Sequence, residues 1–275
     1  MSINKVIIPI AGLGTRFLPV TKVVPKEMLP ISGKPILQLL VEEAVKAGIT
    51  EVIFVINKEK ELVIRDYFNP KTPTSQKIEE KGKREHLEEL HTLIDNLTIH
   101  YEIQEEQHGD GHAILQAEKH CEGEDAVAVL FGDDLVMNTD PDAPNALEQL
   151  IKAYEKVKTS IIALEEVSPE EVHNYGIVET ASEPESKDLY EIDDMVEKPS
   201  KEDAPSNLGV IGKYIITKET IEALHESKKG KDGEIRLIDG FKTLMTSQNI
   251  HGLKVHGTRY DTGTLDGYRK AISEL

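Results

Sequence analysis

The sequence predicts an α/β protein with an open, mostly parallel mixed sheet flanked by helices. Three observations lead to this prediction. Short apolar runs alternate with helical patterns through the first 165 residues, a glycine-rich turn follows the first run, and an acidic turn follows a later one. Turns of these two kinds at the ends of buried strands are typical of α/β sheets that bind ligands there.

The first part of the chain alternates predicted strands with predicted helices. Lys5 to Ile10 is a short apolar run, which predicts a strand buried on both faces. Pro35 to Ala47 keeps apolar residues at helical spacing, with proline in the first turn and Gly48 just past the end. The same patterns predict strands at Glu51 to Asn57, Ile99 to Ile103, Ala126 to Phe131 and Ser160 to Glu165, and helices at about 111 to 120 and 144 to 157.

Two segments depart from this alternation. Residues 69 to 96 are polar and begin with two prolines, which predicts a helical insertion on the surface that adds little to the core. After Val167 the pattern breaks into shorter pieces. These predict strands at Tyr175 to Glu179, Glu191 to Val196 and Gly209 to Ile216, with helices near 217 to 227 and 235 to 247.

Composition excludes several functional classes. The 275 residues carry 32 Lys and Arg against 50 Asp and Glu, a net charge of −18 that excludes nucleic acid as a default partner. No stretch approaches the ~20 apolar residues of a membrane span, and the N-terminus does not have the pattern of a signal peptide. Cys121 is the only cysteine, so an internal disulfide and a cysteine-based zinc site are excluded. We expect a cytoplasmic protein with no membrane partner.

A glycine-rich loop after the first predicted strand is the strongest motif. Gly12 and Gly14 allow backbone N–H groups to approach phosphates, and Arg16 and Lys26 add two cations suited to a triphosphate. The loop is not the dinucleotide fingerprint, because Phe17 stands at the third glycine position, and the segment around Gly33 is not a P-loop. The plainer interpretation is an ordinary turn with solvated charges.

Two acidic motifs predict a metal site. Asp133 and Asp134 close the strand Ala126 to Phe131, and Asp261 lies near the end of the chain. Two distant aspartates brought together at the carboxyl edge of a sheet can hold Mg²⁺, which prefers carboxylate and phosphate oxygens. The alternative is that each aspartate only stabilises a turn or caps a helix.

Glu197 and Lys198 stand side by side at the end of another predicted strand. Alternation sends them to opposite faces, so one can hold a sugar hydroxyl and the other a phosphate. A solvated ion pair is the alternative. The ten histidines show no metal-binding pattern.

Taken together, these residues resemble the nucleoside-diphosphate-sugar pyrophosphorylases, and most closely the branch of bacterial UTP:glucose-1-phosphate uridylyltransferases. The motifs follow the family's order through nearly the whole chain: the loop from Gly12 to Lys26, Gln104, Gly109 to Ala113, Gly132 to Asp134, Tyr175-Gly176, Glu197 to Pro199, Ser206 to Leu208, Gly233 to Ile235 and Asp261 to Gly263.

The resemblance implies a Rossmann-like fold of the nucleotidyltransferase type A kind, as one domain over residues 1–275. Residues 1–165 would bind the nucleotide and carry the insertion at about 69–96, and residues 166–275 would form the sugar-binding β subregion and the C-terminal part. The nucleotide-binding residues would be Ala11, Gly12, Gly14, Thr15, Gln104 and Gly109. Gln104 would read the uracil edge, because an amide offers both a donor and an acceptor.

The same resemblance assigns the remaining roles. Arg16, Lys26, Asp133 and Lys198 would be catalytic, with Arg16 and Lys26 neutralising the triphosphate and Lys198 holding the sugar phosphate. Asp133 and Asp261 would bind Mg²⁺, the expected cofactor, with Asp134 supporting the metal. The sugar-binding residues would be Asp134, Gly176, Glu197, Lys198 and Val210.

The implied reaction joins UTP and glucose 1-phosphate into UDP-glucose and pyrophosphate. Glucose 1-phosphate is largely a dianion at pH 7 and can itself attack the α-phosphorus, so the chemistry needs no dedicated base. Three alternatives stay open: a glucose-1-phosphate thymidylyltransferase, a sugar nucleotidyltransferase of relaxed specificity, and a non-catalytic sensor of nucleotide sugars. Association into a homo-oligomer is also left open.

Overall fold

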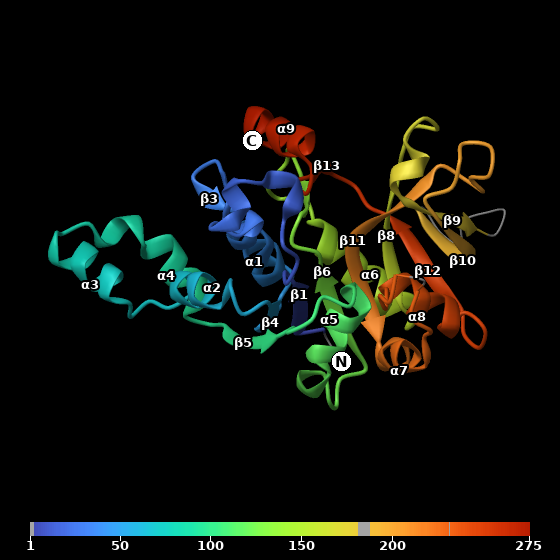
Figure 1. The fold of residues 1–275 in the computed structure, drawn as a ribbon, viewed down its shortest axis with the longest axis horizontal. Helices are drawn as coiled ribbons and strands as arrows, with labels where there is room; N and C mark the ends of the chain where they lie inside the picture. Colours follow the sequence, from blue (N-terminus) through green and yellow to red (C-terminus); the bar gives the residue numbers. More distant parts are fainter. Residues whose placement is uncertain (1–2, 181–187, 231) are drawn as a thin grey trace.

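A mixed sheet forms the centre of the structure, a computed structural model that describes residues 3–180, 188–230 and 232–275. Within these residues the main sheet has nine strands in the order β5-β4-β1-β6-β11-β8-β12-β10-β9 (Figure 1). They are β1 Lys5–Pro9, β4 Glu51–Ile56, β5 Thr98–Ile103, β6 Ala126–Leu130, β8 Ile161–Glu166, β9 Gly176–Thr180, β10 Leu189–Glu197, β11 Leu208–Thr217 and β12 Ile250–Lys254. Two small ribbons pair β2 Pro30–Ile31 with β3 Lys34–Pro35, and β7 Asp134–Met137 with β13 Thr258–Asp261.

Helices cover both faces of the sheet (Figure 1). The α-helices of the described residues are α1 Ile36–Lys46, α2 Glu61–Tyr67, α3 Pro73–Glu80, α4 Glu88–Ile94, α5 Asp110–Gln116, α6 Ala146–Val157, α7 Lys218–Glu226, α8 Leu237–Leu244 and α9 Leu265–Glu274. One core lies between the sheet and α1 and α6, and a second core lies between the opposite face and α5, α7 and α8. Strand β1 supplies Val6 and Ile8 to the first core and Ile7 to the second, because successive side chains of a strand point to opposite faces.

The direction of the strands changes part-way across the sheet. Strands β5, β4, β1 and β6 pair in parallel, as the alternation of strand and helix predicts. Strand β11 is antiparallel to β6 and β8, β12 is parallel to β8, and β10 is antiparallel to β12 and β9. The α/β class is confirmed, but parallel pairing prevails only in the N-terminal half. No helix of more than one turn separates the described parts of β9, β10 and β11, and such short connections favour antiparallel neighbours.

The sequence patterns located every predicted strand and helix to within a few residues. They did not predict the strands β2, β3, β7, β12 and β13, nor the helices α2 and α9. Within the described residues, β7 and β13 form a two-stranded ribbon across more than a hundred residues of sequence. Each has only four residues, which is too short for a periodic pattern to be recognised. The insertion at 69–96 is helical as predicted. Helix α3 lies well away from the sheet (Figure 1), whereas α4 packs Ile94 into the first core.

The C-terminal helix returns to the N-terminal part of the chain. The Tyr268 hydroxyl of α9 donates a hydrogen bond of 3.0 Å to the Pro30 carbonyl, and its ring packs edge-on against Phe17. This contact places the β13–α9 turn beside the glycine-rich loop. Among the described residues, no helix combines the length and the apolar character that crossing a membrane requires.

Candidate active site

The site lies where three parallel strands end. The glycine-rich loop follows β1, Gln104 follows β5, and Asp133 lies three residues after the end of β6. Because parallel strands end at the same edge of a sheet, these three segments meet there. The structure brings them together around a cavity of about 290 Å³, whose lining includes Ala11, Gly12, Lys26, Gln104, Gly109 and Asp133.

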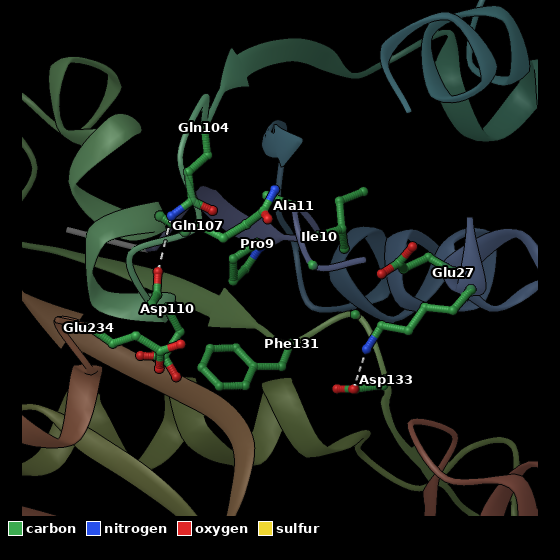
Figure 2. A pocket seen from close by; sticks show the side chains of 15 residues that line it. Pro9, Ile10, Ala11, Glu27, Gln104, Gln107, Asp110, Phe131, Asp133 and Glu234 are labelled. Carbon is green, nitrogen blue, oxygen red and sulfur yellow. Dashed lines mark hydrogen bonds and ion pairs between the residues drawn. The ribbon is translucent and has the colours of Figure 1, made fainter. Parts of the chain in front are cut away.

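We call this the nucleotide-side cavity, because four of the residues predicted to bind the nucleotide line it. Figure 2 shows Gln104 and Ala11 toward one end of the cavity, and Glu27 and Asp133 toward the other. The Gln104 side chain is buried. Its Nε2 donates hydrogen bonds to the Gly109 carbonyl, at 3.1 Å, and to His112 Nδ1, at 2.9 Å. The amide is therefore fixed in orientation, as selective hydrogen bonding to a planar ring edge requires.

The loop around Gly109 is locked to a distant segment of the chain. Ile235 donates its N–H to the His108 carbonyl at 2.7 Å, and Gly111 donates to the Ile235 carbonyl at 3.0 Å. Gly109 has a φ of +97°, and a Cβ there would lie 2.3 Å from the Ile235 oxygen, so only glycine fits. The segment that follows Gly233 thus forms part of the cavity wall.

Asp110 joins the two halves of the site. Its Oδ1 accepts a hydrogen bond of 2.7 Å from the N–H of Leu237, the first residue of α8. Burial raises the pKa of Asp110 to about 6, although the N–H groups of Leu237 and Gly111 oppose the shift. Asp110 and Phe131 line both the nucleotide-side cavity and a neighbouring cavity of about 390 Å³.

This second cavity brings together all five predicted sugar-binding residues, and we call it the sugar-side cavity for that reason. Its lining includes Arg16, Asp134, Gly176, Glu197, Lys198, Val210 and Asp261. Lys198 has a φ of +48°, and its N–H donates to the Tyr175 carbonyl at 2.9 Å. Its ammonium lies 3.4 Å from the Glu197 carboxylate, and both side chains are about half exposed and open to a ligand. A Cβ on Gly176 would lie 3.3 Å from Glu197 Oε2.

A tight ion pair lies at the end of the nucleotide-side cavity away from Gln104 (Figure 2). Lys26 Nζ lies 2.5 Å from Asp133 Oδ2. Burial acts to raise the pKa of Asp133, but Lys26 and Arg16 outweigh it, and the pKa falls below its ordinary value. Burial acts to lower the pKa of Lys26, and Asp133 and Glu27 raise it above the ordinary value. Both groups therefore stay charged at neutral pH.

Asp133 and Asp261 face a common point, although more than a hundred residues separate them. A Cβ added to Gly263 would lie 2.5 Å from Asp133 Oδ2 and 3.0 Å from Asp261 Oδ1. Burial raises the pKa of Asp261, and the nearby Asp134 and Asp133 raise it further. A cation beside this point would relieve the repulsion between the carboxylates.

The glycine-rich loop is divided between cavities. Ala11 and Gly12 face the nucleotide side, whereas Arg16 faces the sugar side and its Nη1 donates to the Gly263 carbonyl at 3.3 Å. Thr15 lines a third hollow, together with Leu18 and Lys60. Gly14 lies in the turn beside it, with a φ of +65° and its carbonyl bonded to the Thr21 hydroxyl. The nucleotide contacts of Gly14 and Thr15 stay predictions.

A family model described as "Nucleotidyl transferase" matches residues 5–275. The match spans almost the whole chain, including every segment of the site.

The chain belongs to the nucleotidyl transferase family.

Relatives that carry an enzyme name match this nucleotidyl transferase over nearly its whole length. A Bacillus subtilis protein named UTP–glucose-1-phosphate uridylyltransferase YngB is 40% identical over 273 residues, which are 99% of this chain and 89% of the relative. A Pseudomonas aeruginosa UTP–glucose-1-phosphate uridylyltransferase is 39% identical over 98% of this chain and 95% of its own.

Solved structures share the fold of this nucleotidyl transferase. A UDP-glucose pyrophosphorylase complexed with UDP-glucose has a TM-score of 0.88 and 41% identity over 98% of this chain and 97% of its own. A UTP-bound enzyme from Acinetobacter baumannii has a TM-score of 0.89 and 33% identity over 98% of this chain and 92% of its own.

Arg259 is a residue of the nucleotidyl transferase site that the sequence analysis did not single out. It lines the sugar-side cavity and pairs with both oxygens of Asp134, and its Nη1 donates to the Tyr175 hydroxyl at 3.1 Å. The signal was present, because Arg259 precedes Asp261 by two residues and so shares its face of strand β13. The spacing of Arg259 and Asp261 is informative only once residues 258–261 are known to form a strand, and the sequence analysis did not predict that strand.

Proposed function

We propose that this nucleotidyl transferase is a UTP:glucose-1-phosphate uridylyltransferase, which forms UDP-glucose and releases pyrophosphate. The observation that carries the proposal is the joining of two cavities at Asp110 and Phe131, with cationic side chains and a pair of aspartates at their junction. One cavity has a fixed amide suited to a pyrimidine edge, and the other has carboxylate and ammonium groups suited to a sugar phosphate. Relatives with this name cover the whole chain.

The proposed chemistry is an in-line displacement at the α-phosphorus of UTP. An oxygen of the glucose 1-phosphate dianion forms the new bond to that phosphorus, and the bond to the β-phosphate oxygen breaks, so pyrophosphate leaves with its electron pair. No proton needs to be removed from the attacking phosphate. The protein has to position two polyanions and offset their repulsion.

The charged side chains divide this work. Lys26, from the nucleotide side, and Arg16, from the sugar side of the junction, would neutralise the triphosphate and the charge that builds on the leaving pyrophosphate. Lys198 would hold the sugar phosphate, with Glu197 and Gly176 at the glucose hydroxyls. Support for this division comes from the positions of Lys26 on the nucleotide side and Lys198 on the sugar side.

The family generally uses a divalent metal ion. We propose Mg²⁺, held by Asp133 and Asp261. The donor set fits, because Mg²⁺ takes one or two carboxylates together with substrate phosphates and water. A structural zinc site would need a closed set of four protein ligands. Within the described ranges no group of three or more His, Cys, Asp or Glu residues is arranged to hold a metal ion. When bound, the ion would neutralise phosphate oxygens.

Glucose-1-phosphate thymidylyltransferase activity is the alternative. A Bacillus anthracis protein titled a putative enzyme of that kind has a TM-score of 0.76 but only 19% identity, which shows a shared fold alone. The relatives of about 40% identity bear the uridylyltransferase name, so UTP is favoured.

Pyrophosphate release with Mg²⁺ tests the proposal. Purified protein would be supplied with UTP or dTTP and with glucose 1-phosphate or galactose 1-phosphate. We expect a strong preference for UTP with glucose 1-phosphate. Equal use of dTTP would indicate relaxed specificity, and binding of UDP-glucose without turnover would indicate a sensor. Light scattering of the same sample would measure self-association.

A further inference from the structure

A second buried ion pair, between Glu27 and Lys60, lies next to the segment that carries Lys26. Glu27 follows Lys26 in sequence, is 1% exposed, and accepts a hydrogen bond of 2.9 Å from Lys60 Nζ through Oε2. Lys60 is also buried, in the turn after β4. Burying two charges is costly, so a pair of this kind needs a reason beyond stability.

Lys60 also holds the glycine-rich loop. Its Nζ donates a second hydrogen bond, of 2.8 Å, to the Ile10 carbonyl. In the same turn Asn57 Nδ2 donates to the Ala11 carbonyl at 2.7 Å, while Asn57 Oδ1 accepts from the Lys60 N–H at 3.0 Å. The turn after β4 therefore binds the carbonyls of Ile10 and Ala11, which lead into the glycine-rich loop. Through Glu27 it also binds the segment that carries Lys26.

The charges of these residues are coupled. Burial lowers the pKa of Lys60, the Glu27 carboxylate opposes this shift, and the nearby Lys26 adds to it. Glu27 also acts to raise the pKa of Lys26. One carboxylate thus stabilises both ammonium groups, and Lys26 can stay charged close to a second buried cation.

The Glu27 carboxylate is not fully satisfied. Its Oε1 is buried and has no hydrogen-bond partner among the described residues, and the residue lines the nucleotide-side cavity beside Ile10 (Figure 2). A residue placed for stability alone would be expected to use both oxygens, because an unpaired buried acceptor costs free energy.

We infer that Glu27 and Lys60 are positioning residues for the proposed nucleotidyl transfer, which fix Lys26 relative to the glycine-rich loop. The inference rests on the proposed function. Loss of the pair leaves Gln104 and Gly109 in place, because other elements hold them, and Asn57 still holds the Ala11 carbonyl. The contacts proposed for the base and ribose are therefore retained. It frees Lys26 to leave the position where it offsets phosphate charge, so the chemical step slows.

The test uses a double variant, Glu27→Gln with Lys60→Met, which removes both charges and leaves no buried ion unpaired. The matched control is Glu43→Gln with Lys213→Met. That pair is comparably buried, at 2.6 Å, but it joins α1 to β11 and lines neither of the two cavities. Measurements are kcat, the Kd for UTP by calorimetry, and the urea unfolding midpoint.

We expect the first variant to lose at least about tenfold in kcat with a Kd for UTP within about threefold of wild type. The control should lose stability but keep kcat. The inference is overturned if both variants keep kcat, if both lose it equally, or if weaker UTP binding accounts for the whole loss. The single variant Glu27→Gln, which keeps an acceptor for Lys60, should show the same split and serves if the double variant does not fold.

A readout independent of turnover separates this inference from the proposed function. Acetylation of Lys26 by an amine-reactive reagent, followed by mass spectrometry, reports its accessibility. We expect faster modification of Lys26 in the Glu27→Gln, Lys60→Met variant than in wild type or the control variant. Equal modification rates in the variant and in wild type would overturn the inference, whether or not the wild type makes UDP-glucose. If the wild type is inactive but Lys26 is modified faster in the variant, only the proposed function is overturned.

Discussion

The guanidinium of Arg259 pairs with both oxygens of the Asp134 carboxylate, joining strand β13 to strand β7. Asp134 Oδ2 also accepts the Gly212 N–H at 2.7 Å. The register of β11 against β8 shifts between Val210 and Tyr214, which frees this N–H from the ladder. The Asp134 carboxylate is therefore held by three hydrogen bonds from two residues, and its pairing with Arg259 fixes the strand that carries Asp261.

Arg259→Ala should reduce both stability and sugar binding. It leaves the Asp134 carboxylate buried without its cation, which we expect to cost about 3 kcal/mol in the free energy of unfolding. Urea denaturation measures this cost, and the KM for glucose 1-phosphate should rise as the cavity wall loosens. Arg269→Ala, on the exposed face of α9, is the control and should change neither quantity. An unfolding free energy equal to wild type would contradict the proposed role of the pair.

Lys26→Ala should lower kcat by roughly 100-fold or more, because it removes a fixed charge that stabilises the departing pyrophosphate. The KM for glucose 1-phosphate should change far less. Steady-state kinetics with Lys22→Ala as control distinguish a local role from a general loss of positive charge, since Lys22 is exposed in the same loop. Comparable losses in the two variants would argue against a specific role for Lys26.

Lys198→Ala should act mainly on the sugar phosphate. Its ammonium is half exposed in the sugar-side cavity, so its removal should raise the KM for glucose 1-phosphate about tenfold with a smaller change in kcat. Lys201→Ala is the control, because Lys201 pairs with Glu170 on the surface. If Lys198→Ala and Lys26→Ala change kcat and KM in the same proportions, the division of roles is wrong.

Removal of the metal should abolish turnover, and Asp261→Asn should raise the Mg²⁺ concentration needed for half-maximal activity about tenfold or more. A titration of activity with Mg²⁺ after treatment with a chelator gives both results. Asp266→Asn, in the first turn of α9 and exposed, should leave the titration unchanged. Full activity in the presence of excess chelator would rule out the proposed metal site.

Asp110 should make stability depend on pH. Burial raises its folded-state pKa to about 6, above the unfolded value, so between pH 4 and 6 the folded state binds the proton more tightly. Ionisation therefore costs the folded state stability as pH rises through this window. Relative to wild type, Asp110→Asn should gain stability from pH 4 to 6, by less than about 1.4 kcal/mol per pH unit, and level off above. A stability difference between Asp110→Asn and wild type that does not change with pH would contradict this prediction.

The sequence located much of the site because its signals are local. A strand followed by a glycine-rich turn, or by two aspartates, places those residues at the edge of the sheet without knowledge of the rest of the fold. The structure accordingly places Gly12, Lys26, Gln104 and Asp133 around one cavity. Local signals could not reveal Arg259 or Lys60, because each acts through a partner that is distant in sequence and each lies outside a recognisable motif.

The sequence by itself determined the α/β class, the order of most elements and the chemistry available at the ends of the strands, since periodicity and turn residues are properties of short segments. Tertiary structure alone decided three features: the reversal of direction at β11, the pairing of β7 with β13, and the approach of Asp261 to Asp133. These depend on contacts between residues up to about 130 positions apart, whose free energies come from packing and charge pairing in the folded chain rather than from local preference.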